Sequence, residues 1–259
     1  MTTATTFVQL AIASSLIATT AFANDAIDPG DSDSRWVAGG VIGGFTNVYA
    51  GEDNESTFFP AFQYNGERFF VKNGSLNFAL GSQGEFSYGL TASPSGTLLS
   101  DESEYKDNEK LAGLVERDFT MEGGFYVYHT TDKGRMKFIL NTDLGSKHEG
   151  QTALLSYTFD LRAGDWYVNP YVGAEWVSGN KADHYFGVSE AEANEFREAY
   201  KADSSLNLFA GVRGRYELTD HWDVNLNAGF VALGDGIKDS SIVDEDFAYH
   251  TSVGINYNF

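Results

Sequence analysis

Histidines are the residues of this 259-residue chain best suited to hydrolytic or metal chemistry. Five are present and widely separated, at His129, His148, His184, His221 and His250. None stands in an H-E-x-x-H motif or in another spacing typical of zinc ligands. His250 and Ser252 would share one face of a strand, but without an orienting acid or an oxyanion donor they form at most a hydrogen-bonded pair. The sequence therefore predicts no catalytic site, no metal site and no cofactor.

Carboxylates are the second group with possible chemistry, because the formal net charge is -20. This charge excludes nucleic acid as a partner, since phosphate binding needs clustered Lys and Arg. The acids gather in four runs, at 25–33, 101–109, 190–198 and 235–246. Runs of this kind are typical of solvated loops, and the run at 101–109 lacks the Gly and terminal Glu of an EF-hand loop.

The end of the chain, 251–259, indicates what kind of element separates these loops. Apolar residues alternate there with small polar ones, and a period of two predicts a strand with one apolar face. That face carries Val253, Ile255, Tyr257 and Phe259. The opposite face, made of Ser, Gly and Asn, is too polar for the second side of a packed sandwich. A last strand of this form resembles the signal that the barrel-assembly machinery of bacterial outer membranes reads; the edge strand of a soluble sheet is the alternative.

Alternating segments recur from Trp36 onward and predict an all-β fold, a transmembrane antiparallel β-barrel over 36–259. Such barrels have an even number of strands and place short periplasmic turns opposite longer external loops. The short connections at 65–67, 81–83, 131–134, 162–165 and 218–221 all fall on the side of the amino terminus. This holds if 68–72 and 75–80 are two strands, which gives about twelve in all. Merging them leaves ten strands as the fallback.

One long external loop, 178–204, carries a helix signal. Ser189 followed by Glu192 forms the capping-box pattern, which predicts a short helix continuing to about Tyr200.

The amino terminus indicates export. An apolar core at 7–18 followed by Ala21-Phe22-Ala23 predicts a secretory signal peptide over 1–23. An acidic lead-in over 24–35 follows it. No later apolar run reaches the roughly 18 residues of a spanning helix. We therefore expect the mature chain in the cell outer membrane.

Six charged residues stand on the polar faces of the predicted strands, namely Glu122, Arg135, Lys137, Glu175, Arg213 and Arg215. In a barrel these are lumen charges with two interpretations, the lining of a pore or a mutually neutralising plug. The plug is favoured, because side chains can fill much of the interior of a small barrel.

Three sequence blocks together resemble one known family. They are GGFTNVYAGEDNESTFFPAFQYNGERFFVKNG at 43–74, YFGVS at 185–189 followed by an acidic segment, and YELTDHW at 216–222 leading into the closing strand. In order and spacing they resemble the MipA/OmpV family of outer-membrane proteins over about 36–259. The resemblance implies a non-enzymatic barrel of the outer membrane, in contact with its lipid. The acidic loops, as solvated loops, would contact lipopolysaccharide through loosely held cations.

The resemblance also implies a partner class. One family member resembles a scaffold that brings a murein lytic transglycosylase together with a bifunctional penicillin-binding protein. We therefore expect a role in organising the cell envelope. The alternative from another functional class is a narrow channel for small solutes.

Overall fold

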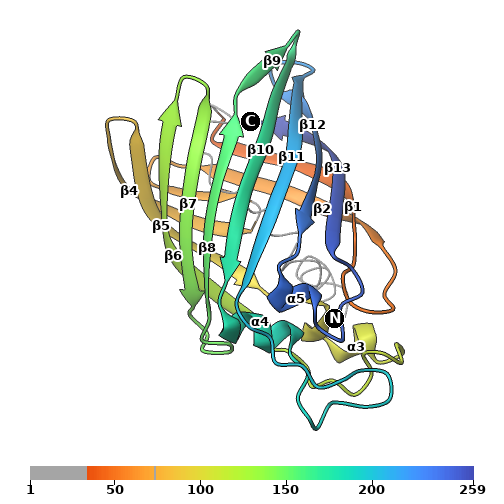
Figure 1. The fold of residues 1–259 in the computed structure, drawn as a ribbon. Helices are drawn as coiled ribbons and strands as arrows, with labels where there is room; N and C mark the ends of the chain where they lie inside the picture. The colour runs from red at the N-terminus through yellow and green to blue at the C-terminus, as the bar shows by residue number, and fades with distance from the viewer. Residues whose placement is uncertain (1–33, 73) are drawn as a thin grey trace, which may run out of the picture.

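A computed structural model describes residues 34–72 and 74–259, so the predicted signal peptide at 1–23 and nearly all of the acidic lead-in lie outside the described residues. The described chain forms one antiparallel β-barrel (Figure 1). The strands are β1 (Trp36–Phe45), β2 (Glu55–Asn65), β3 (Phe69–Lys72), β4 (Ser75–Gln83), β5 (Phe86–Ser95), β6 (Thr120–Thr131), β7 (Gly134–Asp143), β8 (Gln151–Phe159), β9 (Leu161–Ala163), β10 (Trp166–Val177), β11 (Ser205–Glu217), β12 (Trp222–Ala232) and β13 (Phe247–Asn258). Pairing of β13 with β1 closes the wall.

The wall has twelve strands, because β8 and β9 are one strand interrupted at Asp160. Both halves pair with β10 in a continuous register. The interruption lies opposite Pro170, which has no N–H to donate to the Phe159 carbonyl. Asn169 Nδ2 donates to that carbonyl instead, at 3.1 Å. The prediction of twelve strands is therefore confirmed, and β3 and β4 are separate strands as it required.

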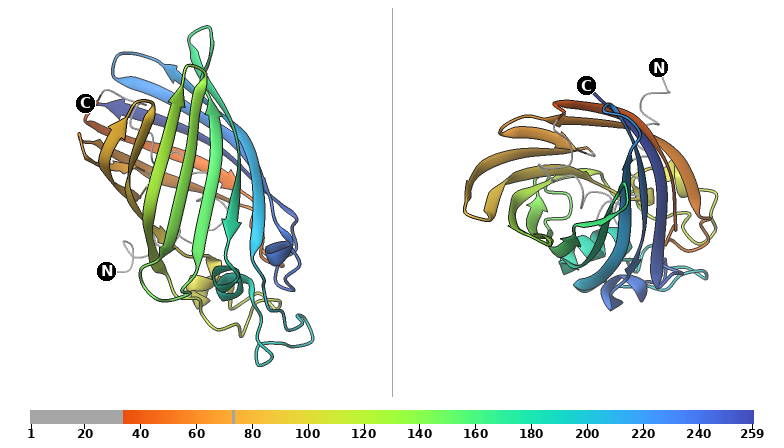
Figure 2. Two further views of the ribbon diagram at one scale, coloured as in Figure 1. Left: turned by 60° about the vertical axis from the view of Figure 1, so that its left-hand side comes forward. Right: turned by 90° about the horizontal axis from the view of Figure 1, so that it is seen from above.

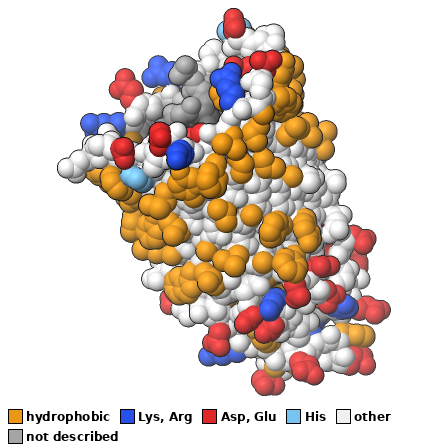
Figure 3. All heavy atoms as spheres, turned by 45° about the horizontal axis from the view of Figure 1, so that its top comes forward, with side chains coloured by type: hydrophobic (Ala, Val, Ile, Leu, Met, Phe, Trp, Pro, Cys, Tyr) orange, Lys and Arg blue, Asp and Glu red, His pale blue; other side chains and the backbone are white. Residues whose placement is uncertain are grey.

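Side chains alternate between an apolar outer face and a polar or aromatic inner face. On β11, Leu206 and Leu208 are 56% and 53% exposed, whereas Ser205, Asn207 and Phe209 between and beside them are buried. Figure 3 shows the apolar side chains spread over the middle of the wall, with the charged ones gathered toward its two ends. This is the distribution that a strand wall in a bilayer requires.

The two ends of the barrel differ in their connections (Figures 1 and 2). Short turns at 66–68, 84–85, 132–133, 164–165 and 218–221 lie at one end. The long connections lie at the other, which we call external, and carry η1 (Leu98–Ser100), α3 (Glu102–Tyr105), α4 (Gly179–Phe186) and α5 (Asp235–Lys238). The predicted segregation of short and long connections is confirmed. The turn expected at 81–83 lies at 84–85, because β4 continues through a bulge to Gln83. None of the helices in the described part of the chain is long and apolar enough to cross a bilayer.

The loop helix lies earlier than predicted. The loop 178–204 does hold a helix, but it is α4, and 189–200 forms turns. Ser189 and Glu192 still make capping-box contacts, since the Ser189 backbone N and Oγ donate to Glu192 Oε2 at 2.9 and 2.7 Å. The prediction of a helix over 189–200 was wrong because Glu192 also accepts from Val115 and Arg117 of another loop, so the motif closes a tertiary turn.

Candidate functional site

The long connections pack together over the external end of the barrel. We call them the external cap, residues 46–54, 96–119, 144–150, 178–204 and 233–246. Its largest fully buried side chains come from three different loops and are Leu99, Tyr105, Leu111, Tyr185, Phe186, Ile237 and Ile242. Burial to this degree is typical of a folded domain core and unusual for loops, which normally run exposed over a surface.

Tyr49, from a fourth loop, completes this core. Its ring stacks on Phe186 with 5.5 Å between centroids, and its hydroxyl donates to the Tyr185 carbonyl at 3.3 Å. Burial raises the pKa of both Tyr49 and Tyr185 far above the usual range of a phenol. Both hydroxyls therefore stay neutral at any physiological pH and remain available as hydrogen-bond donors.

Glu192 joins two loops of the cap. Its Oε1 lies 3.0 Å from Arg117 Nη2 and accepts from the Val115 N–H at 2.9 Å. Although burial opposes ionisation, the hydrogen bonds from Ser189 and Val115 and the charge of Arg117 lower the pKa of Glu192 to about 2. Arg197, which donates to the carbonyls of residues 110 and 112, adds a second connection between the same loops.

Asp143, at the end of β7, organises the short loop 144–150. Its Oδ2 accepts the N–H groups of Lys147, His148 and Glu149 at 2.6, 2.8 and 3.0 Å. Its Oδ1 accepts from the Thr120 hydroxyl at 2.6 Å. These contacts hold His148 in a buried position within the cap.

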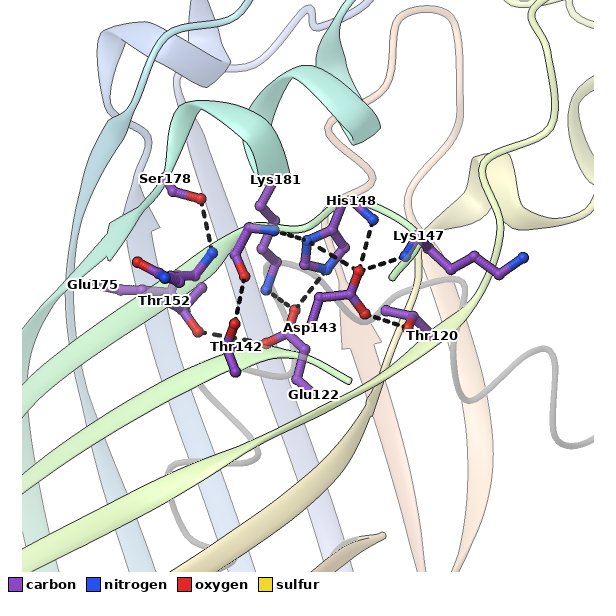
Figure 4. A network of polar contacts seen from close by, with 12 residues as sticks. Thr120, Glu122, Thr142, Asp143, Lys147, His148, Thr152, Glu175, Ser178 and Lys181 are labelled. Carbon is purple, nitrogen blue, oxygen red and sulfur yellow. Dashed lines mark hydrogen bonds and ion pairs between the residues drawn. The ribbon is translucent and has the colours of Figure 1, made fainter. Parts of the chain in front are cut away.

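A buried charged cluster binds α4 to the barrel wall (Figure 4). Glu122 Oε1 on β6 lies 2.6 Å from Lys181 Nζ on α4 and 3.2 Å from His148 Nε2. Thr152 Oγ1 donates to the other carboxylate oxygen at 3.4 Å. Because all of these groups are nearly inaccessible to water, the ion pair acts as a fixed attachment of the cap.

The six predicted lumen charges lie in two layers. Glu122 and Glu175 are buried near the external end, and Glu175 accepts from Asn207 Nδ2 at 3.4 Å. Glu175 is level with Asn207 on β11, so Arg213 lies six residues farther along that strand, or about 20 Å. Along β7, Lys137 is displaced by the same number of residues from Asp143, the register partner of Glu122.

The cations of the second layer lie against tyrosine rings. The Arg213 guanidinium is 4.5 Å from the centroid of Tyr171, and that of Arg215 is 4.6 Å from Tyr167. Arg135 lies 5.7 Å from the ring of Tyr128, and Lys137 is buried. The two carboxylates therefore lie in one layer near the external end, and the four cations lie in the second layer. In the second layer the three arginines make cation–π contacts.

Sequence reasoning missed Lys181 and His148, the partners of Glu122. Lys181 stands in a polar loop and His148 in a short turn, so neither lies in a pattern that indicates burial. The histidine weighed with Ser252, His250, contacts Tyr171 instead, with 3.1 Å between Nε2 and Oη. Within 34–72 and 74–259, no three His, Cys, Asp or Glu side chains are placed to hold a metal ion together.

A barrel of this kind, with a covered mouth, can be compared with known proteins. The family model for MltA-interacting protein MipA matches residues 39–259. The chain belongs to the MipA family. The resemblance seen in the sequence is thereby confirmed, and the MipA-family chain is a protein of the bacterial outer membrane.

Relatives of this MipA-family barrel share about a quarter of its residues. Putative outer membrane protein YiaT of Escherichia coli K12 is 26% identical over 82% of this chain and 85% of its own. MltA-interacting protein of the same strain is 24% identical, covering 88% and 92% of the two chains. Outer membrane protein OmpV of Vibrio cholerae is 24% identical over 88% of each.

Proposed function

We propose that this MipA-family barrel is a non-catalytic scaffold that holds a murein lytic transglycosylase, and with it a bifunctional penicillin-binding protein, at the inner face of the outer membrane. The external cap is the observation that carries the proposal. A packed apolar core over the mouth suits a protein whose work is done at the opposite end. The name of one relative, MltA-interacting protein, supports the same class of partner.

The periplasmic turns supply a surface for such a partner. Lys133 and Asp132 on one turn and Arg162 and Asp165 near another are exposed. Mixed charges at a rim favour orientation and a fast encounter more than raw affinity. The scaffold would therefore bind reversibly and respond to salt.

The test uses the purified barrel in detergent and the murein lytic transglycosylase of the same bacterium. We expect the double variant Lys133→Glu/Arg162→Glu to weaken binding by about tenfold, equal to about 1.4 kcal/mol. The matched control is Asp53→Lys/Glu190→Lys, which reverses two exposed charges in the external cap and should bind like the parent. No measurable binding by the parent, or equal loss in both variants, would contradict the scaffold.

Conductance separates the scaffold from a solute channel. In planar bilayers the parent should give no reproducible open steps. Stable steps from the intact protein would show that the external cap does not close the mouth, and would remove the support that the cap gives to the scaffold.

We also propose that Val253, Ile255, Tyr257 and Phe259 act as the signal that the barrel-assembly machinery reads. Phe259 is 67% exposed on the outer face, and its ring lies 4.8 Å from that of Tyr257. Deletion of Phe259 should reduce assembly in cells but leave refolding in detergent nearly unchanged. Normal assembly in cells would exclude this role.

A further inference from the structure

One seam of the barrel wall lacks strand pairing between described residues. β2 has eleven residues, yet only Tyr64 and Asn65 pair with β3. Among the described residues, no strand pairs with that side of β2 at 55–63. Across the gap, β5 pairs with β4 only as far as Ala92, so 93–95 is paired with β6 alone. We call these two free edges, 55–63 of β2 and 93–95 of β5, the β2–β5 seam.

The hydrogen-bond phase of β2 shows which groups face the seam. The Asn65 N–H donates to the Arg35 carbonyl across β1, so every second residue from Asn65 points its backbone groups toward β1. The residues between them point toward the seam, namely Ser56, Phe58, Pro60 and Phe62. Pro60 therefore removes a donor from the free edge and none from the β1–β2 ladder.

On the other side of the seam, the hydrogen bonds between β5 and β6 show which backbone groups of β5 face the seam. The Thr130 N–H donates to the Glu85 carbonyl, which fixes the alternation between β5 and β6. By that alternation Pro94, opposite Met121, directs its nitrogen away from β6 and toward the seam. Two of the four prolines of the chain thus stand where a neighbouring strand would need an N–H. Pro60 and Pro94 therefore remove a donor from each edge of the seam, which opposes addition of a strand from another chain.

An unpaired strand edge cannot lie against lipid tails, because its backbone donors and acceptors would lose water without replacement. Irregular or unpaired backbone at membrane depth is tolerated only where it is buried in protein or lines a hydrated cavity. Pro60 and Pro94 oppose pairing of the seam with an added strand. We therefore interpret the β2–β5 seam as a hydrated opening between the barrel interior and the membrane.

The outer rim of the seam is apolar. Phe58 and Phe62 of β2 point outward and are 55% and 53% exposed. On the other side an apolar groove of about 630 Å³ crosses the outer wall over β3 to β6. The small residues Ala92 and Gly123 line the groove beside Leu90 and Phe125. Ala92 is its last lining residue on β5, directly before the free edge at 93–95.

The groove, the seam and the external cap together suggest a route. A single alkyl chain matches the apolar groove, and a polar head matches the backbone groups of the seam. The external cap covers the entrance along the barrel axis. An amphiphile in the outer leaflet would therefore reach the barrel interior through the seam. We propose that the β2–β5 seam is a lateral portal through which a single-chain amphiphile passes between the outer leaflet and the barrel interior. This goes beyond the scaffold, which concerns the turns and not the wall.

Single cysteines test the portal, because the chain has no Cys of its own. Thr57, Gly43 and Ser252 form one row across β2, β1 and β13, so Thr57 and Ser252 lie at the same level with inward side chains. Ser252 lies in a fully paired part of the wall, with partners on both β1 and β12. Thr57→Cys is therefore the test variant, Ser252→Cys the matched control, and outward Phe58→Cys the positive control.

The protein is reconstituted in phosphatidylcholine vesicles and treated with hexadecyl maleimide carried in the bilayer or with a water-soluble sulfonated maleimide. We expect hexadecyl maleimide to modify Thr57→Cys about tenfold faster than Ser252→Cys, with folding verified by heat-modifiable mobility. Equal rates at the two positions would overturn the portal. So would a preference for Thr57→Cys over Ser252→Cys that appears with the sulfonated reagent alone and not with hexadecyl maleimide, because it would indicate a hydrated pocket closed to lipid.

A second pair keeps the portal testable if Thr57→Cys does not fold. Ala61, Gly39 and Asn256 form another row across the same three strands. Ala61→Cys and Asn256→Cys should show the same difference in rate, and equal rates would again overturn the portal. Neither pair touches the periplasmic turns, so the outcome is independent of binding to a murein enzyme.

Discussion

The connections at the two ends of this barrel have opposite relations to solvent. At the periplasmic end, the turn residues 84–85, 132–133, 164–165 and 218–221 are all exposed. At the external end, the connections fold back and bury Leu99, Tyr105 and Phe186 completely. A turn that only joins two strands needs no core of its own. A loop that closes a mouth does, because it must fix its own conformation in water.

This difference implies that the cap and the wall can lose stability separately. The wall is stabilised by strand pairing outside the β2–β5 seam and by its lipid-facing side chains, whereas the cap depends on a small apolar core and a few buried charges. Local opening of the cap should therefore occur at lower free energy than unfolding of the barrel. Each substitution below is expected to act on one of these parts.

Phe186→Ala should have the largest effect on the cap. Its ring is fully buried and stacks on Tyr49, so truncation should cost about 3 to 5 kcal/mol of local stability. Hydrogen exchange of the loop 178–204 should accelerate while heat-modifiable mobility of the barrel is unchanged. Phe196→Ala, in the same loop but 51% exposed, is the matched control and should change exchange little. Loss of the whole barrel in Phe186→Ala would show that cap and wall are one cooperative unit.

Lys181→Met should come next. It leaves the buried Glu122 carboxylate without its cation, at a cost of about 3 kcal/mol, the lower end of the usual range because His148 and Thr152 still donate to it. Adding Glu122→Gln should restore much of the loss, since no buried charge then remains unpaired. Lys238→Met, which breaks an exposed pair with Asp235, is the control. The protease sensitivity of the cap measures the effect in all three variants. If the double variant shows no recovery, the Glu122–Lys181 pair is not what attaches the cap to the wall.

The strands could be predicted from sequence because one physical rule sets the outer face. Every second residue of a wall strand meets lipid, so residues such as Leu206, Leu208 and Val212 show the period directly. Turn positions were predicted within a few residues for the same reason. The bulge near Gly81 moved one of them, and no local pattern marks a bulge of this kind.

The cap could not be predicted because its contacts join residues far apart in the chain. Arg117 and Glu192 are 75 positions apart, and Lys181 meets Glu122 across a similar separation. The signal at Ser189 and Glu192 was a true capping pattern, but its carboxylate was shared with another loop. Prolines 60 and 94 were visible in the sequence, yet only strand register shows that both nitrogens face one seam.

Glu192→Gln tests the charged contacts of the cap through pH. Its pKa of about 2 lies below the roughly 4.3 of an unfolded Glu. A depressed pKa means that the ionised group stabilises the cap above about pH 4.3, and that this stabilisation is lost as the pH falls through about 2. At neutral pH the variant should lose about 2 kcal/mol, and its exchange rates should no longer show this dependence. Glu195→Gln, exposed in the same loop, should behave like the parent.

Gly164→Ala should have the smallest effect, and it tests the periplasmic end of the comparison. Gly164 has φ +63°, and a Cβ built there meets no atom within 4 Å, so the only penalty is the left-handed backbone. The expected cost is about 1 kcal/mol, confined to the β9–β10 turn. Gly164→Asn should cost less, because Asn tolerates that conformation. Exchange of the external cap should be the same in both variants and the parent, since no buried contact between residues that the structure describes links this turn to the loops. A change in cap exchange would show that the two ends are coupled through β10.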